Sequence, residues 1–366
     1  MISFDLTEEQ RMVRDTVGAF AREEIAPAAR PADESGEIPA ALIAKAWQLG
    51  LVRGPLPERL GGDGDTRSAL TGAIIAEELA AGDLAIATHI LAPRLFAFPI
   101  LEMGTDAQRD TYLRRFTGPD FIPAGAALME PRFDFDAVDL QTRARADGSG
   151  FILDGRKCMV ALASASEAFL VYAAGNGDSR VQAFIVPRGV SGLTVRDREK
   201  NMGLKALETF EVEFSECRLG PEAKLGGEAG IDHGRILSQS RVALAAMAVG
   251  MSRAAFDYAR AYAKERRAFG APIATRQAVA FMLADMAIEV DASRLLAWEA
   301  AWRLDRGEDA ARESYLARNY VASAALKIAD NAVQTLGGHG YIREHPVEMY
   351  LRNARGFATL EGLATV

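Results

Sequence analysis

The chain has 366 residues, and at about 150 residues per domain this length predicts two or three packed units. Hydrophobic residues make up 49% and charged residues 25%, which is typical of a globular protein and excludes a disordered or collagen-like chain. The formal net charge of −8 excludes a broadly basic surface, so nucleic acid is not an expected partner.

The cysteine content and the apolar stretches indicate where in the cell the protein is expected. Cys158 and Cys217 form no C-x2-C pair, which is typical of a reducing compartment and indicates no zinc site. Residues 1–7 lack the basic start and apolar middle of a signal peptide. The longest uncharged stretch in the last third, residues 242–252, is shorter than the roughly 20 residues of a membrane-spanning helix. We therefore expect a cytoplasmic protein without a membrane partner.

The first third of the chain predicts helices. Residues 7–10 read Thr-Glu-Glu-Gln, a capping box that starts a helix, and we expect that helix to end at Pro27 and Pro31. Glu77 and Glu78 are assigned to a solvated helix face. Further helices are expected at residues 39–50, 67–81, 84–102 and 106–116.

From about residue 120 the pattern changes to short runs with period two, which predict strands. The clearest run is 210–214, Phe-Glu-Val-Glu-Phe, because its three apolar side chains share one face. Further strands are expected at residues 151–153, 169–173 and 183–186. Turn clusters at 147–150 and 175–178 separate the runs, so the pattern predicts a small antiparallel sheet or barrel without a helical crossover.

After Gly226 and Gly227 the helical period returns in long segments, at about residues 231–264, 276–306 and 309–336. Met282, Met286 and Val290 recur every four residues, as on a core-facing helix of a bundle. The fold class is therefore mostly α with a central β domain. We place an N-terminal all-helical domain at 1–119, a middle β domain at 120–227 and a C-terminal helical bundle at 228–366.

Two segments near the end of the chain carry candidate ligand groups. Residues 262–273 read Y-A-K-E-R-R-A-F-G-A-P-I, which fits either a cationic helix end or an arginine fork for a diphosphate. Residues 334–340 read Q-T-L-G-G-H-G, which fits either a glycine-rich helix stop or a close backbone approach to a ligand. The sequence contains neither a strand followed by G-x-G-x-x-G nor a P-loop, and its four histidines show no H-E-x-x-H spacing, so we expect no metal site.

Both segments, in this order, resemble the signature regions of the acyl-CoA dehydrogenase family of flavoproteins. Asn201-Met202-Gly203, Arg241, the extension Q-T-L-G-G-H-G-Y-I-R-E-H-P to residue 346 and Thr359-Leu-Glu-Gly362 add to the similarity, which covers essentially the whole chain. The resemblance implies an N-terminal helical domain, a middle antiparallel β-barrel and a C-terminal four-helix bundle.

The resemblance also implies an activity, the α,β-dehydrogenation of an acyl-CoA thioester. Glu361 would remove the α-proton, and the β-hydride would pass to N5 of FAD. The α-proton of a thioester is a very weak acid. Its removal requires a base with a pKa raised by an apolar pocket, and hydrogen-bond donors positioned for the enolate oxygen. In the family one of those donors is the backbone N–H of the base. Arg241 is carried over as a substrate-binding residue close to the active site, and an electron-transferring flavoprotein is the implied electron acceptor.

The similarity carries five residues onto contacts with the FAD of a neighbouring subunit. Arg266 and Phe269 correspond to cofactor contacts across a subunit interface, and Gln334, Gly337 and Gly338 to the diphosphate and adenine side. A shared site of this kind implies a homodimer or homotetramer.

At the flavin ring the sequence departs from the family. Met129 stands where the family has the threonine of Thr-Glu-Pro, and Met159 and Ala161 stand where it has the tryptophan and threonine of Trp-Ile-Thr-Asn. Two lost hydrogen bonds and one lost aromatic contact total about 1.5–4.5 kcal/mol, so FAD would bind about tenfold to a thousandfold or more weakly. Three alternatives stay open: a homo-oligomeric FAD enzyme, a flavin-poor subunit paired with a homologous partner, and a non-redox acyl-CoA lyase or binding protein.

Overall fold

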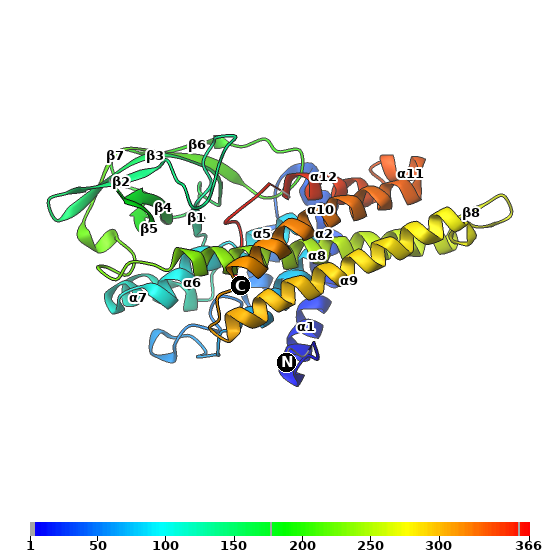
Figure 1. Cartoon of the computed structure of the whole chain (residues 1–366), viewed down its shortest axis with the longest axis horizontal. Helices are drawn as coiled ribbons and strands as arrows, with labels where there is room; N and C mark the ends of the chain where they lie inside the picture. The colour runs from blue at the N-terminus through cyan, green and yellow to red at the C-terminus, as the bar shows by residue number, and fades with distance from the viewer. Residues whose placement is uncertain (1–3, 176–177, 358) are drawn as a thin grey trace.

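The structure is a computed structural model that describes residues 4–175, 178–357 and 359–366. It consists of an N-terminal helical part, a middle β part and a C-terminal part of long helices (Figure 1). The N-terminal helices are α1 (Glu8–Phe20), α2 (Ala26–Ser35), α3 (Ala40–Trp47), α4 (Ala69–Gly82), α5 (Leu84–Leu91), α6 (Arg94–Met103) and α7 (Asp106–Tyr112). Short 3-10 turns lie at Glu58–Leu60 and Arg114–Thr117.

The start of α1 is as predicted, but its end is not. The Thr7 hydroxyl accepts a hydrogen bond from the Gln10 backbone N–H at 3.1 Å, and the Gln10 side chain accepts one from Thr7 N–H at 3.0 Å. The predicted helix end at Pro27 and Pro31 is wrong, because a π-helical turn, η1 (Ala21–Ile25), leads directly into α2. Pro27 then falls in the first turn of α2, after the i−4 ladder has been interrupted, where a missing N–H costs little.

The apolar segment Leu84–Met103 forms the centre of the helical part. It is long and apolar enough to cross a membrane, but 89% of it is buried among other elements, as expected of a core segment. Its composition is therefore explained by packing. Leu84, Ile86, Leu91 and Ile100 are almost fully inaccessible to solvent.

The middle part is one sheet of seven strands. They are β1 (Gly125–Ala127), β2 (Arg143–Asp147), β3 (Gly150–Ala161), β4 (Ala168–Gly175), β5 (Asp178–Pro187), β6 (Leu193–Arg198) and β7 (Thr209–Leu219). The strand order is β1-β4-β2-β3-β7-β6, and β5 pairs with β4. Phe210, Val212 and Phe214 are buried on one face of β7, as their alternation predicts.

The predicted antiparallel barrel is corrected to a mixed sheet. β4 pairs in parallel with both β1 and β2, with Gly125 opposite Phe169 in the first pair, whereas the other pairings are antiparallel. Within the described residues the pairings form an open path that does not close on itself. Alternation along a strand shows which face is buried but carries no information on strand direction, so the sequence pattern was compatible with either sheet.

The C-terminal part is built on three long antiparallel helices, α8 (His233–Glu265), α9 (Gln277–Asp305) and α10 (Ala311–Leu336). The hairpin of β8 (Arg267–Ala268) and β9 (Ala271–Pro272) joins α8 to α9. After the short α11 (Gly338–Tyr341), the helix α12 (Val347–Phe357) packs against α10 and α8. In Figure 1 the sheet lies over one end of the long helices, and the β8–β9 hairpin and α11 lie at the opposite end.

Candidate active site

Glu361 lies in the segment that follows α12, between the buried side chains of Leu360 and Leu363. Its side chain is 22% exposed. Oε1 lies 3.4 Å from Nε of Arg241, which comes from α8, and Oε2 is buried without a hydrogen-bond partner. The carboxylate is therefore held inside the protein, and one of its oxygens is free to accept a proton.

Arg318 of α10 holds the segment that carries Glu361. Its Nη2 donates hydrogen bonds to the carbonyl oxygens of Phe357 at 2.8 Å and Leu360 at 2.7 Å. Arg318 is only 5% exposed. Sequence reasoning missed this residue, since one arginine in a long amphipathic helix carries no local signal of its partners.

Met129 lies directly against Glu361. The backbone N–H of Glu361 donates a hydrogen bond to Met129 Sδ at 3.4 Å. Met129 O in turn accepts from Cys158 N–H at 2.9 Å, which places Met159 next to it. The structure thus places one of the three altered flavin-ring positions beside the predicted base, and a second, Met159, directly follows a residue that is hydrogen-bonded to the first.

Met159 and Ala161 lie at the end of β3. Met159 adopts a positive φ of 53°, and its thioether lies 3.9 Å from Nδ2 of Asn201. Its N–H donates to Oε1 of Glu199 at 3.2 Å, whereas Glu199 Oε2 is buried without a partner. Ala161 is buried, and its carbonyl lies close to Gly125 of β1. At the predicted flavin-ring positions, the groups near a bound ligand would therefore be thioethers, backbone groups and one unpaired carboxylate oxygen in place of the family's hydroxyl donors.

The other five predicted cofactor residues lie around the β8–β9 hairpin and the junction of α10 and α11, elements that Figure 1 shows at the end of the long helices away from the sheet. They are Arg266, Phe269, Gln334, Gly337 and Gly338. Arg266, Gln334 and both glycines are exposed, and the Phe269 side chain is 96% exposed. At Gly337 and Gly338 a Cβ atom would meet nothing within 4 Å.

The two groups of predicted cofactor positions therefore lie far from each other within one chain (Figure 1). The exposed arginine, the exposed aromatic ring and the open glycine surface fit the diphosphate and adenine half of FAD. The free Glu199 oxygen beside Met159 fits a ring N–H donor on the other half.

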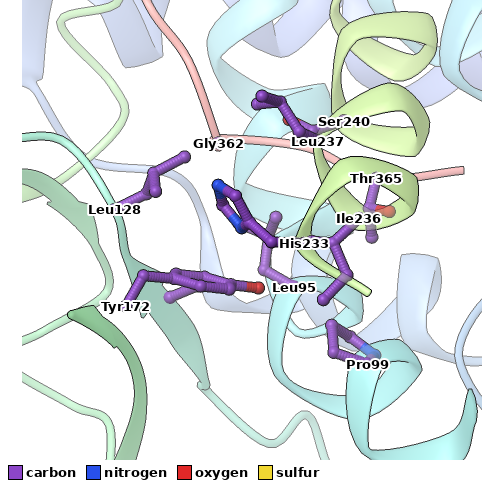
Figure 2. Close-up of a pocket in the computed structure, with 11 residues that line it drawn as sticks. Leu95, Pro99, Leu128, Tyr172, His233, Ile236, Leu237, Ser240, Gly362 and Thr365 are labelled. Carbon is purple, nitrogen blue, oxygen red and sulfur yellow. The ribbon is translucent and has the colours of Figure 1, made fainter. Parts of the chain in front are cut away.

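A narrow cavity adjoins the Glu361 segment (Figure 2). It holds about 20 Å³, room for one water molecule. The lining residues are Leu95, Pro99, Ala126, Leu128, Tyr172, His233, Ile236, Leu237, Ser240, Gly362 and Thr365. In Figure 2, Tyr172 projects from the sheet side, and Leu95 and Pro99 project from the helical side.

The polar groups of this cavity were not singled out by sequence reasoning. His233 Nε2 lies 2.8 Å from the carbonyl oxygen of Ala137, so the hydrogen is on Nε2, and Nδ1 is a buried acceptor without a partner. Burial lowers the pKa of His233, which favours the neutral ring. Ser240 Oγ is likewise buried and unpaired. The signal available in the sequence was the position of both residues in the first two turns of α8, before Arg241.

Among the described residues, no group of three or more His, Cys, Asp or Glu side chains is placed to hold a metal ion.

Three family models match the chain in succession. They are described as the acyl-CoA dehydrogenase N-terminal domain at residues 7–118, the middle domain at 125–217 and the C-terminal domain at 233–366. The chain is 35% identical to the mitochondrial short-chain specific acyl-CoA dehydrogenase of Bos taurus, over 100% of this chain and 89% of that protein.

Solved structures agree with these matches. The butyryl-CoA dehydrogenase of Megasphaera elsdenii superposes with a TM-score of 0.88 at 29% identity, over 97% of this chain and 95% of that one. A glutaryl-CoA dehydrogenase of Mycobacterium smegmatis in complex with FADH2 gives a TM-score of 0.86 at 25% identity, over 98% and 92%.

Proposed function

Because this chain belongs to the acyl-CoA dehydrogenase family, we propose that it catalyses the FAD-dependent α,β-dehydrogenation of an acyl-CoA thioester with Glu361 as the base. The observation that supports this role is the state of the Glu361 carboxylate. Arg241 holds one oxygen, and the other is buried, unpaired and next to the cavity-lining Gly362.

The residues around Glu361 supply the parts that proton abstraction requires. The buried Oε2 takes the α-proton of the bound thioester, and the neighbouring side chains of Leu360 and Leu363 are themselves buried and apolar. The backbone N–H of Glu361 donates to the developing enolate oxygen once the Met129 thioether, its present acceptor, turns away. FAD, when bound, accepts the β-hydride.

We infer that the acyl group is short. The cavity next to Glu361, walled by Leu95, Leu128 and Leu237, holds about 20 Å³, so any acyl chain must displace its walls and a short chain displaces them least. Relatives named for short-chain acyl-CoA and for butyryl-CoA support the same choice. Butyryl-CoA should therefore have a higher kcat/KM than octanoyl-CoA, and the opposite order would contradict the size argument.

We further propose that the chain has three domains, at residues 1–119, 120–227 and 228–366. We also propose that it assembles as a homo-oligomer. Phe281, Ile288 and Leu295 are exposed on α9 at intervals of seven residues, an apolar stripe of the kind that packs against another helix. Such packing would allow the far end of one copy to complete the ring side of another. The two free cysteines support a cytoplasmic location, and an electron-transferring flavoprotein is the proposed electron acceptor.

The variant Glu361→Gln tests the role of the base. It should lower kcat for butyryl-CoA by about 10²–10⁴-fold, because amide nitrogen and oxygen cannot take the proton, and should leave bound flavin unchanged. Glu344→Gln, at an exposed position, is the matched control. Unchanged activity of Glu361→Gln with a dye acceptor would rule Glu361 out as the base.

The absorption spectrum of the purified protein tests the cofactor. Near-stoichiometric flavin supports the homo-oligomeric enzyme. A colourless protein that does not take up FAD would favour the flavin-poor subunit of a hetero-oligomer, a candidate that the contact between Met129 and the Glu361 N–H supports. Co-expression with a homologous partner should then restore flavin and activity.

A further inference from the structure

Arg318 is a buried cation in direct contact with the backbone on either side of the turn before Glu361. Its Nη2 donates to Phe357 O, at the end of α12, and to Leu360 O, in the peptide group that joins Leu360 to Glu361. α10 is thereby fastened to the segment that carries the proposed base.

The Leu360–Glu361 peptide group is held at both ends. A peptide unit is planar, and in the trans form its C=O and N–H point in opposite directions. The Leu360 C=O accepts a hydrogen bond from Arg318 Nη2 at 2.7 Å, and the Glu361 N–H donates one to Met129 Sδ at 3.4 Å. The guanidinium therefore determines where the N–H of Glu361 points.

Among the residues that the structure describes, Arg318 forms no ion pair with a carboxylate. Within the described part of the chain its hydrogen bonds go to carbonyl oxygens, its Nε is buried without a partner, and its guanidinium lies 5.6 Å from the centre of the Phe357 ring. Burial lowers the pKa of Arg318, and the Glu361 carboxylate is the charge that acts against this lowering. A buried cation without a hydrogen-bonded carboxylate is costly, so a fold that needed only a carbonyl cap would not require one.

We propose that Arg318 is a positioning residue for the reaction: through the Leu360–Glu361 peptide it orients the Glu361 N–H toward the substrate oxygen and polarises it as a donor. A cation bonded to the carbonyl oxygen strengthens the N–H of the same peptide as a hydrogen-bond donor. This inference rests on the proposed function of Glu361 and adds a second contribution to it, the stabilisation of the enolate oxygen.

The test compares two ligands of the FAD-loaded protein. Acetoacetyl-CoA presents a readily enolised carbonyl to the N–H, whereas S-butyl-CoA is a thioether with no carbonyl. Arg318→Met, which keeps the apolar stem, should weaken acetoacetyl-CoA binding about tenfold to a hundredfold and change S-butyl-CoA binding little. It should also lower kcat for butyryl-CoA more than it changes KM. Arg312→Met, on the exposed side of the same helix, is the control.

Each outcome decides a different point. Equal weakening of both ligands, or of neither, overturns the positioning role of Arg318. A wild-type protein that binds both ligands but does not dehydrogenate butyryl-CoA contradicts the proposed function instead. If Arg318→Met does not fold, Arg318→Lys replaces it. A lysine keeps the charge but not the guanidinium geometry that bonds both carbonyl oxygens, so acetoacetyl-CoA binding should again weaken more than S-butyl-CoA binding, by a smaller factor. Equal affinities of Arg318→Lys and the wild type for acetoacetyl-CoA would overturn the inference.

Discussion

The substitution Lys157→Met should destabilise the protein strongly, because it breaks a buried ion pair. Lys157 is fully buried, and its Nζ donates to Leu128 O at 2.9 Å and to Glu130 Oε1 at 3.0 Å. These contacts fasten β3 to the residues on both sides of Met129, so the pair also fixes the ring side of the cofactor site.

The magnitude follows from what the substitution leaves behind. Removing one partner of a buried pair costs about 3–5 kcal/mol. Glu130 keeps the backbone N–H groups of Gln141 at 2.8 Å and Thr142 at 2.7 Å, and the side chain of Arg132, so we expect the lower end, about 3 kcal/mol. Dividing this loss of about 3 kcal/mol by the unfolding entropy expected for the whole chain gives a fall in Tm of about 4 °C.

The pH dependence gives a second signature. Burial alone would raise the pKa of Glu130, but Lys157 and the two backbone N–H groups outweigh it and lower the pKa to about 2. A lowered carboxylate pKa contributes stability that is present above the ordinary value of 4.5 and is lost as the pH falls toward 2. Without Lys157 the pKa of Glu130 rises, so the variant should lose less stability than the wild type as the pH falls below 4.5, and the stability difference between the two proteins should narrow there.

Calorimetry at fixed protein and FAD concentrations measures both effects. Lys45→Met is the matched control, because Lys45 pairs with Glu24 at 2.7 Å on the surface, with side chains 55% and 39% exposed. An exposed pair contributes about 0–1 kcal/mol, so the control should shift Tm by about 1 °C or less. Equal shifts for Lys157→Met and Lys45→Met would refute the reasoning from burial.

Two further predictions concern FAD. Met129→Thr places a hydroxyl donor at the flavin ring and should tighten FAD binding about twofold to tenfold. Met129→Val is the control, because valine has the shape of threonine without the hydroxyl. Equal FAD affinities of the two variants in reconstitution titrations would contradict this prediction. Arg266→Ala should weaken FAD binding about tenfold to a hundredfold by removing charge-assisted bonds to the diphosphate, with Arg267→Ala as the control; retained affinity would place the diphosphate elsewhere.

The order of helical, β and helical parts could be predicted from the sequence, because it depends on local periodicity. The capping box at Thr7 and the alternation of Phe210, Val212 and Phe214 involve residues within four positions of one another, so a short window contains the whole signal. The resemblance to a family supplied Glu361 and Arg241, which the structure brings to 3.4 Å across 120 positions.

Contacts between distant segments were decided by the tertiary structure alone. Glu77 and Glu78 were assigned to a solvated face, which is wrong: both are buried, Glu77 against Arg294 at 3.0 Å and Glu78 against Arg253 at 2.7 Å. A charged residue at a helical position has the same local pattern whether its partner is water or an arginine 175 positions away. The directions of the strands and the role of Arg318 belong to the same class. Local pattern determines which element forms, whereas the partners of its polar groups depend on where the rest of the chain packs.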